Sequence, residues 1–107
     1  MQERRKENRF RIMVDVEIRS KKMTAKAVAF NISSEGIRLV SSQLFSNGEI
    51  CEVTFKDVKD LPFSATGTIK AINPDSLHSD MKKYGIHFSQ KISAAKLNMI
   101  LKRIGID

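Results

Sequence analysis

The sequence has little of what would build a disulfide framework, a structural metal site or a membrane span. Its 107 residues include one cysteine, Cys51, which excludes an internal disulfide. This cysteine and the two histidines, His78 and His87, are too few for a structural zinc site, which usually takes about four Cys or His ligands. No apolar run approaches the ~18 residues of a membrane-spanning helix. We therefore expect no metal and no membrane span.

Patterns of catalysis and of secretion are also missing. The chain shows no paired acid and base, no nucleophile beside a base and no phosphate-binding glycine loop. We therefore expect no catalytic residues, no enzymatic activity and no resident cofactor. The basic N-terminus is followed by alternating residues rather than by a continuous apolar stretch, so it lacks the pattern of a secretory signal. The expectation is a cytoplasmic domain.

Acidic residues are fewer than basic ones, and the excess positive charge is concentrated towards the two ends of the chain. Nineteen Lys and Arg against twelve Asp and Glu give a formal charge of +7. Residues 1–22 hold eight basic and four acidic side chains, and residues 82–106 hold six basic and no acidic ones. This balance favours an anionic partner such as a nucleotide, a nucleic acid, an acidic protein or an anionic membrane surface. If the fold brings both ends onto one face, they form a joint anion-attracting surface.

Alternation of apolar and polar residues predicts six strands. Residues 10–19 alternate without a break, which is typical of a strand with one buried face. Further strands are predicted over 24–31, from Ile37, and over 51–56, 63–71 and 84–88. In the second strand Val28, Phe30 and then Ile32 share the phase expected of a core face. Asn47-Gly48 is a turn signal before the fourth strand, in which Cys51 shares the phase of the core residues.

The apolar period then changes to that of a helix. Leu97, Ile100, Leu101 and Ile104 form a helical stripe, with Ser93 as a plausible N-cap and Gly105 as a terminator. The predicted fold class is mainly β: a six-stranded antiparallel β-barrel with a C-terminal α-helix. We expect a single domain over residues 1–107, with a flexible basic arm at 1–9, the barrel at 10–89 and the helix region at 91–104.

Two short motifs carry the candidate binding chemistry. The first is Arg4-Arg5-Lys6-Glu7-Asn8-Arg9, which contains Arg5-x-x-x-Arg9 just before the first strand. The second is Asn31-x-Ser33-x-x-Gly36, between the second and third strands. Each has a structural interpretation as well, because a basic run is often a solvated arm and an Asn/Ser/Gly segment is often a tight turn.

Together these motifs resemble the PilZ domain family, bacterial receptors for cyclic di-GMP. The resemblance extends to the alternating strand at 10–18, to Gly36-Ile37-Arg38-Leu39, to Gly48 before a strand and to Gly85-Ile86-His87-Phe88. It implies a six-stranded barrel with a C-terminal helix. It also implies that Arg5 and Arg9 are the ligand-binding arginine pair, and that Asn31, Ser33 and Gly36 are the second binding motif. Arg4 stands where a further arginine accompanies two stacked ligand molecules, so a bound dimer of cyclic di-GMP is the expected form.

The residue types suit this ligand on chemical grounds. Arginine presents a planar fork that bonds a guanine edge or pairs with phosphate, and its plane can stack on a base. Asn31 and Ser33 each offer donor and acceptor atoms. Gly36 removes a side chain where a turn needs positive φ or where the ligand approaches closely. The segment Arg4 to Arg9 lies near the terminus and contains no apolar run, so we expect it to be mobile until the ligand orders it, and this ordering is the predicted switch.

Two other functions stay open at this point. A small basic barrel can bind single-stranded nucleic acid, although few exposed aromatic residues are patterned for stacking and we expect no stable nucleic-acid complex. The chain can also be a PilZ-like protein-interaction module that binds no nucleotide. In the receptor hypothesis the ordered arm creates a surface for an unidentified protein effector, on which the domain acts in trans.

Overall fold

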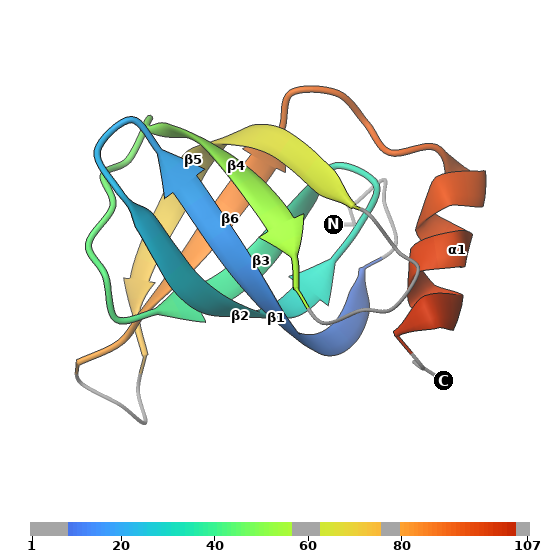
Figure 1. Ribbon diagram of the computed structural model, residues 1–107, viewed down its shortest axis with the longest axis horizontal. Coiled ribbons are helices and arrows are strands. Elements are labelled where there is room, and N and C mark those ends of the chain that lie inside the picture. The colour runs from blue at the N-terminus through green and yellow to red at the C-terminus, as the bar shows by residue number, and fades with distance from the viewer. Residues whose placement is uncertain (1–8, 57–62, 76–79, 105–107) are drawn as a thin grey trace, which may run out of the picture.

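Alternating residues build the walls of a closed barrel (Figure 1). The computed structural model describes residues 9–56, 63–75 and 80–104. The strands pair antiparallel in the order β1-β2-β3-β6-β5-β4, and β4 returns to β1. Their bounds are β1 Phe10–Ser20, β2 Thr24–Ile32, β3 Gly36–Ser41, β4 Ile50–Phe55, β5 Ser64–Pro74 and β6 Lys82–Phe88, followed by helix α1 Ala94–Arg103. The predicted six-stranded antiparallel barrel with a C-terminal helix is confirmed.

The core fills the barrel from the inward positions of every strand. In β1 the predicted phase is confirmed, because Ile12, Val14, Val16 and Ile18 are buried and the residues between them are exposed or half-buried. The β4 phase is confirmed as well, and it places Cys51 in the core. Burial of these side chains is the main favourable term that closes the barrel.

The predicted core face of β2 is wrong. The alanines at 25, 27 and 29 are buried, whereas Val28 and Phe30 are half-buried on the other face. The alanines lie opposite Ile18, Val16 and Val14 of β1, so small residues fill the space that branched residues leave inside the barrel. A register shift between Ala29 and Asn31 then returns Ile32 to the core.

The far end of β5 also differs from the prediction. The strand continues to Pro74, beyond the predicted end at residue 71. Strict alternation from Phe63 would place Ala71 on the core face, but Ala71 is exposed and Ile72 packs against the core instead. A register shift between Ile69 and Ala71 causes this change, because one extra residue reverses the phase of everything after it.

Helix α1 covers one end of the barrel (Figure 1). Leu97 and Ile100 are buried, and Leu101 and Ile104 pack against the core, as the apolar stripe predicts. The Ser93 hydroxyl accepts the backbone N–H of Lys96 at 3.1 Å, which confirms the predicted N-cap. Gly105, the predicted terminator, lies outside the described residues. Within those residues, no helix has the length and apolar character needed to cross a membrane.

Gly36, at the start of β3, is required by the close approach of β6. It pairs with His87, and a β-carbon at this position would collide with the carbonyl oxygen of Ile86. Positive φ is not the reason, because among the described glycines only Gly48 has it, at +90°. Of the two reasons considered from the sequence, the turn conformation is therefore wrong, and a close backbone contact takes its place.

Burial makes the Cys51 thiol a sensitive probe of the barrel. The side chain is 2% exposed, and burial together with the negative charge of Glu49 raises its thiol pKa to about 11. Thiolate is the reactive form, so the folded protein should react very slowly with a thiol reagent at pH 8. The urea-unfolded chain should react at the rate of a free cysteine. A thiol reagent that releases a chromophore on reaction measures both rates by absorbance. Rapid labelling under native conditions would contradict the burial of β4.

Substituting Gly36→Ala should destabilise the barrel by roughly 1–3 kcal/mol, as overpacking does. Gly85→Ala is the matched control, because its new β-carbon would lie 3.4 Å from the Ala71 β-carbon, an ordinary contact. Both variants share the entropic effect of replacing glycine in the unfolded chain, so their difference isolates the collision. Urea unfolding measures it as a difference in midpoint at constant slope. Equal urea midpoints for the two variants would contradict the prediction, because they would show that β6 can move away from residue 36 without loss of stability.

Candidate ligand-binding site

The two sequence motifs meet where the start of β1 pairs with the end of β2. Phe10 pairs with Ile32 and Arg11 with Asn31. Arg9, the residue before β1, donates from Nη1 to Asn31 Oδ1 at 3.3 Å, although 22 residues separate them. Arg9 and Asn31 are both half-buried, so the contact is partly sheltered from water. The antiparallel register thus brings an arginine of the first motif to the asparagine that opens the second.

Ser33 organises the turn between β2 and β3. Its side chain is fully buried, and its hydroxyl oxygen accepts the backbone N–H groups of Glu35 at 3.1 Å and Gly36 at 3.2 Å. The backbone N–H of Ser33 also donates to the Gly36 carbonyl oxygen at 2.9 Å. The structural interpretation of this motif as a tight turn therefore describes Ser33 well, and the turn holds Asn31 and Gly36 in place.

Arg9 and Gly36 line one cleft on the outer wall, with a volume of about 170 Å³. Small residues or glycines contribute from three strands: Gly36 of β3, Ala71 of β5 and Gly85 of β6. Around them are the longer side chains that can reach a ligand, namely Arg9, Glu35, Arg38, Lys70 and His87. The cleft therefore combines a floor close to the backbone with a rim of polar and cationic groups.

Irregular strand pairing surrounds this cleft. Ala29 pairs with Leu39 and Asn31 with Arg38, so Phe30 is an extra residue in β2. In β5 the extra residue is Lys70, because Ile69 and Ala71 pair with consecutive residues of β6. Bulges re-aim side chains and are common beside functional sites. Their presence in two of the strands that border the site is consistent with a wall shaped for binding.

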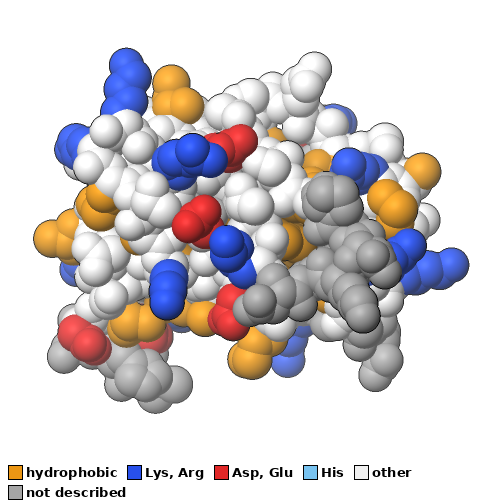
Figure 2. All heavy atoms as spheres, viewed as in Figure 1, with side chains coloured by type: hydrophobic (Ala, Val, Ile, Leu, Met, Phe, Trp, Pro, Cys, Tyr) orange, Lys and Arg blue, Asp and Glu red, His pale blue; other side chains and the backbone are white. Residues whose placement is uncertain are grey.

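The charge of the cleft favours an anion. Three cationic side chains, Arg9, Arg38 and Lys70, contribute to its lining, whereas the one carboxylate, Glu35, has Lys91 Nζ 3.4 Å away. A larger hollow of about 530 Å³ over β1, β2 and β3 is balanced between Asp15, Glu17 and two lysines. The face in Figure 2, which carries β1 and β4, likewise mixes acidic and basic side chains.

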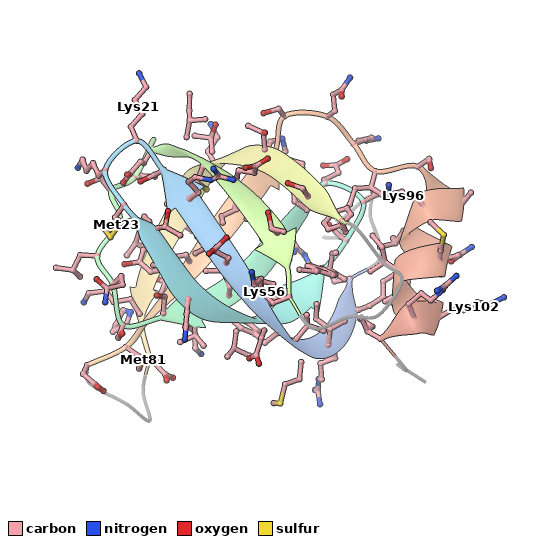
Figure 3. The ribbon with its side chains drawn as sticks, viewed as in Figure 1. Lys21, Met23, Lys56, Met81, Lys96 and Lys102 are labelled. Atoms are coloured by element: carbon pink, nitrogen blue, oxygen red, sulfur yellow. The ribbon has the colours of Figure 1, made fainter. Side chains whose placement is uncertain are left out.

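A third hollow, of about 420 Å³, lies between β5 and the start of α1, and its cations are already engaged. Lys91 is paired with Glu35, and Lys96 Nζ lies 5.8 Å from the centre of the Phe63 ring. Figure 3 shows Lys96 on α1 near the barrel and Lys102 pointing away from it. The cleft at Arg9 is therefore the better candidate for an anionic ligand among the three.

The predicted site residues fall into three groups. Arg9, Asn31 and Gly36 come together at the cleft or at its edge. Ser33 lies beneath them as the buried centre of the turn. The other two arginines of the first motif, Arg4 and Arg5, lie outside the described residues.

Four rim residues were not predicted as site residues: Glu35, which lies within the second motif, and Arg38, Lys70 and His87. The last three have the polar phase of their strands, and Arg38 and His87 also stand in the segments Gly36-Ile37-Arg38-Leu39 and Gly85-Ile86-His87-Phe88 of the family resemblance. Their meeting depends on the pairing of β3 with β6 and of β6 with β5, which a single sequence does not reveal. Elsewhere in the described ranges, no group of three His, Cys, Asp or Glu side chains is placed to hold a metal ion.

Comparison with solved structures identifies the fold. The inhibitor of motility MotI/DgrA of Bacillus subtilis matches with a TM-score of 0.72 at 19% identity, over 96% of this chain and 51% of that one. The PilZ domain of YcgR from Escherichia coli, solved with c-di-GMP, matches with a TM-score of 0.70 at 13% identity, over 95% of this chain and 88% of that one. PlzA of Borreliella burgdorferi, also solved with c-di-GMP, matches with a TM-score of 0.66 at 16% identity, over 97% of this chain and 42% of that one. At these identities the likeness is one of fold.

The chain thus spans about half the length of MotI/DgrA and less of PlzA. A search of curated protein sequences found no match. The comparison with protein families is decisive, because the PilZ domain matches residues 3–104 and so includes both motifs and helix α1. The chain therefore belongs to the PilZ domain family.

Proposed function

We propose that this domain is a noncatalytic receptor for cyclic di-GMP. The observation that carries the proposal is the contact between Arg9 and Asn31 at the edge of a cationic cleft. Cyclic di-GMP offers two phosphodiesters and two guanine edges, and a guanidinium can pair with either group in a bidentate way. Membership of the PilZ family and the fold shared with two c-di-GMP complexes support the same ligand.

The ligand would order the N-terminal arm over this cleft. Arg9 already contacts Asn31, so the arm enters the barrel at the edge of the site. Arg5 lies four residues before Arg9, close enough in sequence for both to bind one ligand. Fixing each residue of the arm costs roughly 1–2 kcal/mol, so several charge-assisted contacts must offset this cost. Arg4 would add a contact to a second, stacked ligand molecule.

The turn beneath the site is bonded to the segment that leads into α1. Ser34 accepts the backbone N–H of Ile92 through its carbonyl oxygen at 2.8 Å. Beside it, Lys91 Nζ lies 3.4 Å from Glu35 Oε2. A ligand that stiffens the turn would therefore stiffen residues 91–93 and the first turn of α1. We propose this connection, together with the ordered arm, as the means by which the domain signals to a protein effector in trans.

Arg9→Ala should weaken binding of cyclic di-GMP by roughly tenfold to a hundredfold, the value of a charge-assisted hydrogen bond. Arg9→Lys should also lose affinity, because lysine keeps the charge but not the planar fork. Arg19→Ala is the control: it removes the same charge at the far end of β1, where Arg19 pairs with Glu52 at 3.1 Å. Isothermal calorimetry gives affinity and stoichiometry, and a ratio of two ligands per chain supports the stacked dimer.

The same calorimetry separates the competing functions. Binding of a single-stranded oligonucleotide without binding of cyclic di-GMP would replace the proposal by a nucleic-acid function, and steep salt dependence would accompany it. If the protein bound neither cyclic di-GMP nor the oligonucleotide, the result would favour the protein-interaction module that binds no nucleotide. An affinity that is equal in the wild type and in Arg9→Ala would remove Arg9 from the site.

Hydrogen exchange tests the connection to α1. Saturating cyclic di-GMP should slow amide exchange at residues 31–36 and also at residues 91–97, because the Ser34–Ile92 hydrogen bond joins them. Lys91→Ala should reduce the protection of residues 91–97, whereas Lys102→Ala, a change at an exposed position near the end of α1, should leave it unchanged. Protection confined to residues 31–36 would show that the helix does not sense the ligand.

A further inference from the structure

We propose that Lys70 and His87 complete the binding site as the wall opposite Arg9, with Lys70 on a phosphodiester and His87 on a guanine base. This inference rests on the proposed function, since it takes cyclic di-GMP as the ligand. Neither residue belongs to the two sequence motifs. Both line the same cleft as Arg9 and Gly36.

Strand register brings these two residues to the cleft. His87 is the β6 residue between Gly36 of β3 and Thr68 of β5, and its side chain is exposed. Beside it, Lys70 is the extra residue of the β5 bulge, also exposed. A bulge changes the direction of one side chain without moving the strand away, so the position of Lys70 on this wall is built into the pairing.

The floor between them leaves room for a flat group. Gly36, Ala71 and Gly85 line the cleft with at most one methyl group each. Large side chains at these positions would fill the space between Arg9 and the β5–β6 wall. Without them a ligand can lie close to the backbone, which is a recurrent use of glycine at binding sites. The planar faces of guanine fit a shallow floor of this kind.

Two lysines near the cleft are engaged with other side chains, whereas the side chains of Lys70 and His87 are available. Lys83 lies over the Phe30 ring at 6.0 Å, and Lys91 pairs with Glu35. Within the part of the chain that the structure describes, the side chains of Lys70 and His87 have no hydrogen bond, ion pair or ring contact. They can therefore bind a ligand without first breaking an internal interaction.

The two side chains suit different parts of cyclic di-GMP. The Lys70 ammonium is a point charge with three donors, which suits a phosphodiester oxygen that has no planar edge. The His87 imidazole is a flat ring with an N–H donor, so it can stack on a base or donate to the guanine O6 or N7 acceptor. Cyclic di-AMP has the same phosphodiesters but lacks the O6 acceptor, and it distinguishes the two roles.

Calorimetry with both dinucleotides tests the assignment. Lys70→Ala should weaken cyclic di-GMP binding roughly tenfold, the lower end for a charge-assisted bond, and should reduce its salt dependence. Because the phosphodiesters are shared, the preference for cyclic di-GMP over cyclic di-AMP should not change. Lys26→Ala is the control: it removes an exposed lysine of β2 that lines the mixed-charge hollow instead.

His87→Ala should weaken cyclic di-GMP binding roughly fivefold or more, the value of a stacked base. His87→Phe keeps a stacking ring but removes the N–H donor, so it should restore only the stacking part of the affinity and should reduce the preference for cyclic di-GMP over cyclic di-AMP. Both sites are exposed, and unchanged thermal unfolding of the variants would show that the fold is intact.

The outcomes separate this inference from the function beneath it. Suppose that the wild type binds cyclic di-GMP and that Arg9→Ala loses affinity. If the Lys70 and His87 variants then bind as the wild type does, the assignment of Lys70 and His87 is overturned, whereas the proposed receptor function is not. If the wild type does not bind cyclic di-GMP, both are overturned. Losses at Lys70 and His87 that match those of Lys26→Ala would show a general charge effect and would also overturn the assignment.

Discussion

The pairing of β1 with β2 is the constraint on which the candidate site depends. Its register places Arg11 opposite Asn31, and therefore brings Arg9 within hydrogen-bond reach of the asparagine side chain. A slip of one residue would turn the whole apolar face of β1 towards water. The burial that fixes the strand thus also fixes the entry of the arginine arm. The site costs no separate positioning energy here, because core packing already holds its two halves together.

The turn from Asn31 to Gly36 shows how one segment meets structural and binding requirements together. Ser33 satisfies the backbone of the turn, Gly36 lets β6 approach, and Asn31 contacts the arginine. A structural reading and a ligand-binding reading of this motif are therefore compatible. Ser33 lies underneath and Asn31 contacts Arg9, which is the arrangement expected of a preorganised site on a scaffold.

Local patterns predicted the barrel well where alternation was strict, as in β1 and β4. They failed in β2, because hydrophobicity favoured Val28 and Phe30 as core residues whereas the interior opposite β1 has room for alanines. They also failed after the bulge at Lys70, since a bulge reverses phase without a distinctive residue. For the site, motif residues are readable from the sequence, but the β3–β6–β5 register that gathers its other wall is a property of the folded chain.

The position of charge in the fold matters more here than its total. The sequence is most basic at its two ends, yet the cleft draws its cations from Arg9, Arg38 and Lys70, two of which belong to the nearly neutral middle of the chain. The basic C-terminal segment reaches the site indirectly, through Lys91 on Glu35. Because Lys91 offsets the carboxylate at the rim, this segment makes the cleft more favourable to an anion without lining it. The two basic ends therefore act on one cleft in different ways: the N-terminal end contributes Arg9 to its lining, and the C-terminal end places Lys91 beside the Glu35 carboxylate and leads into α1.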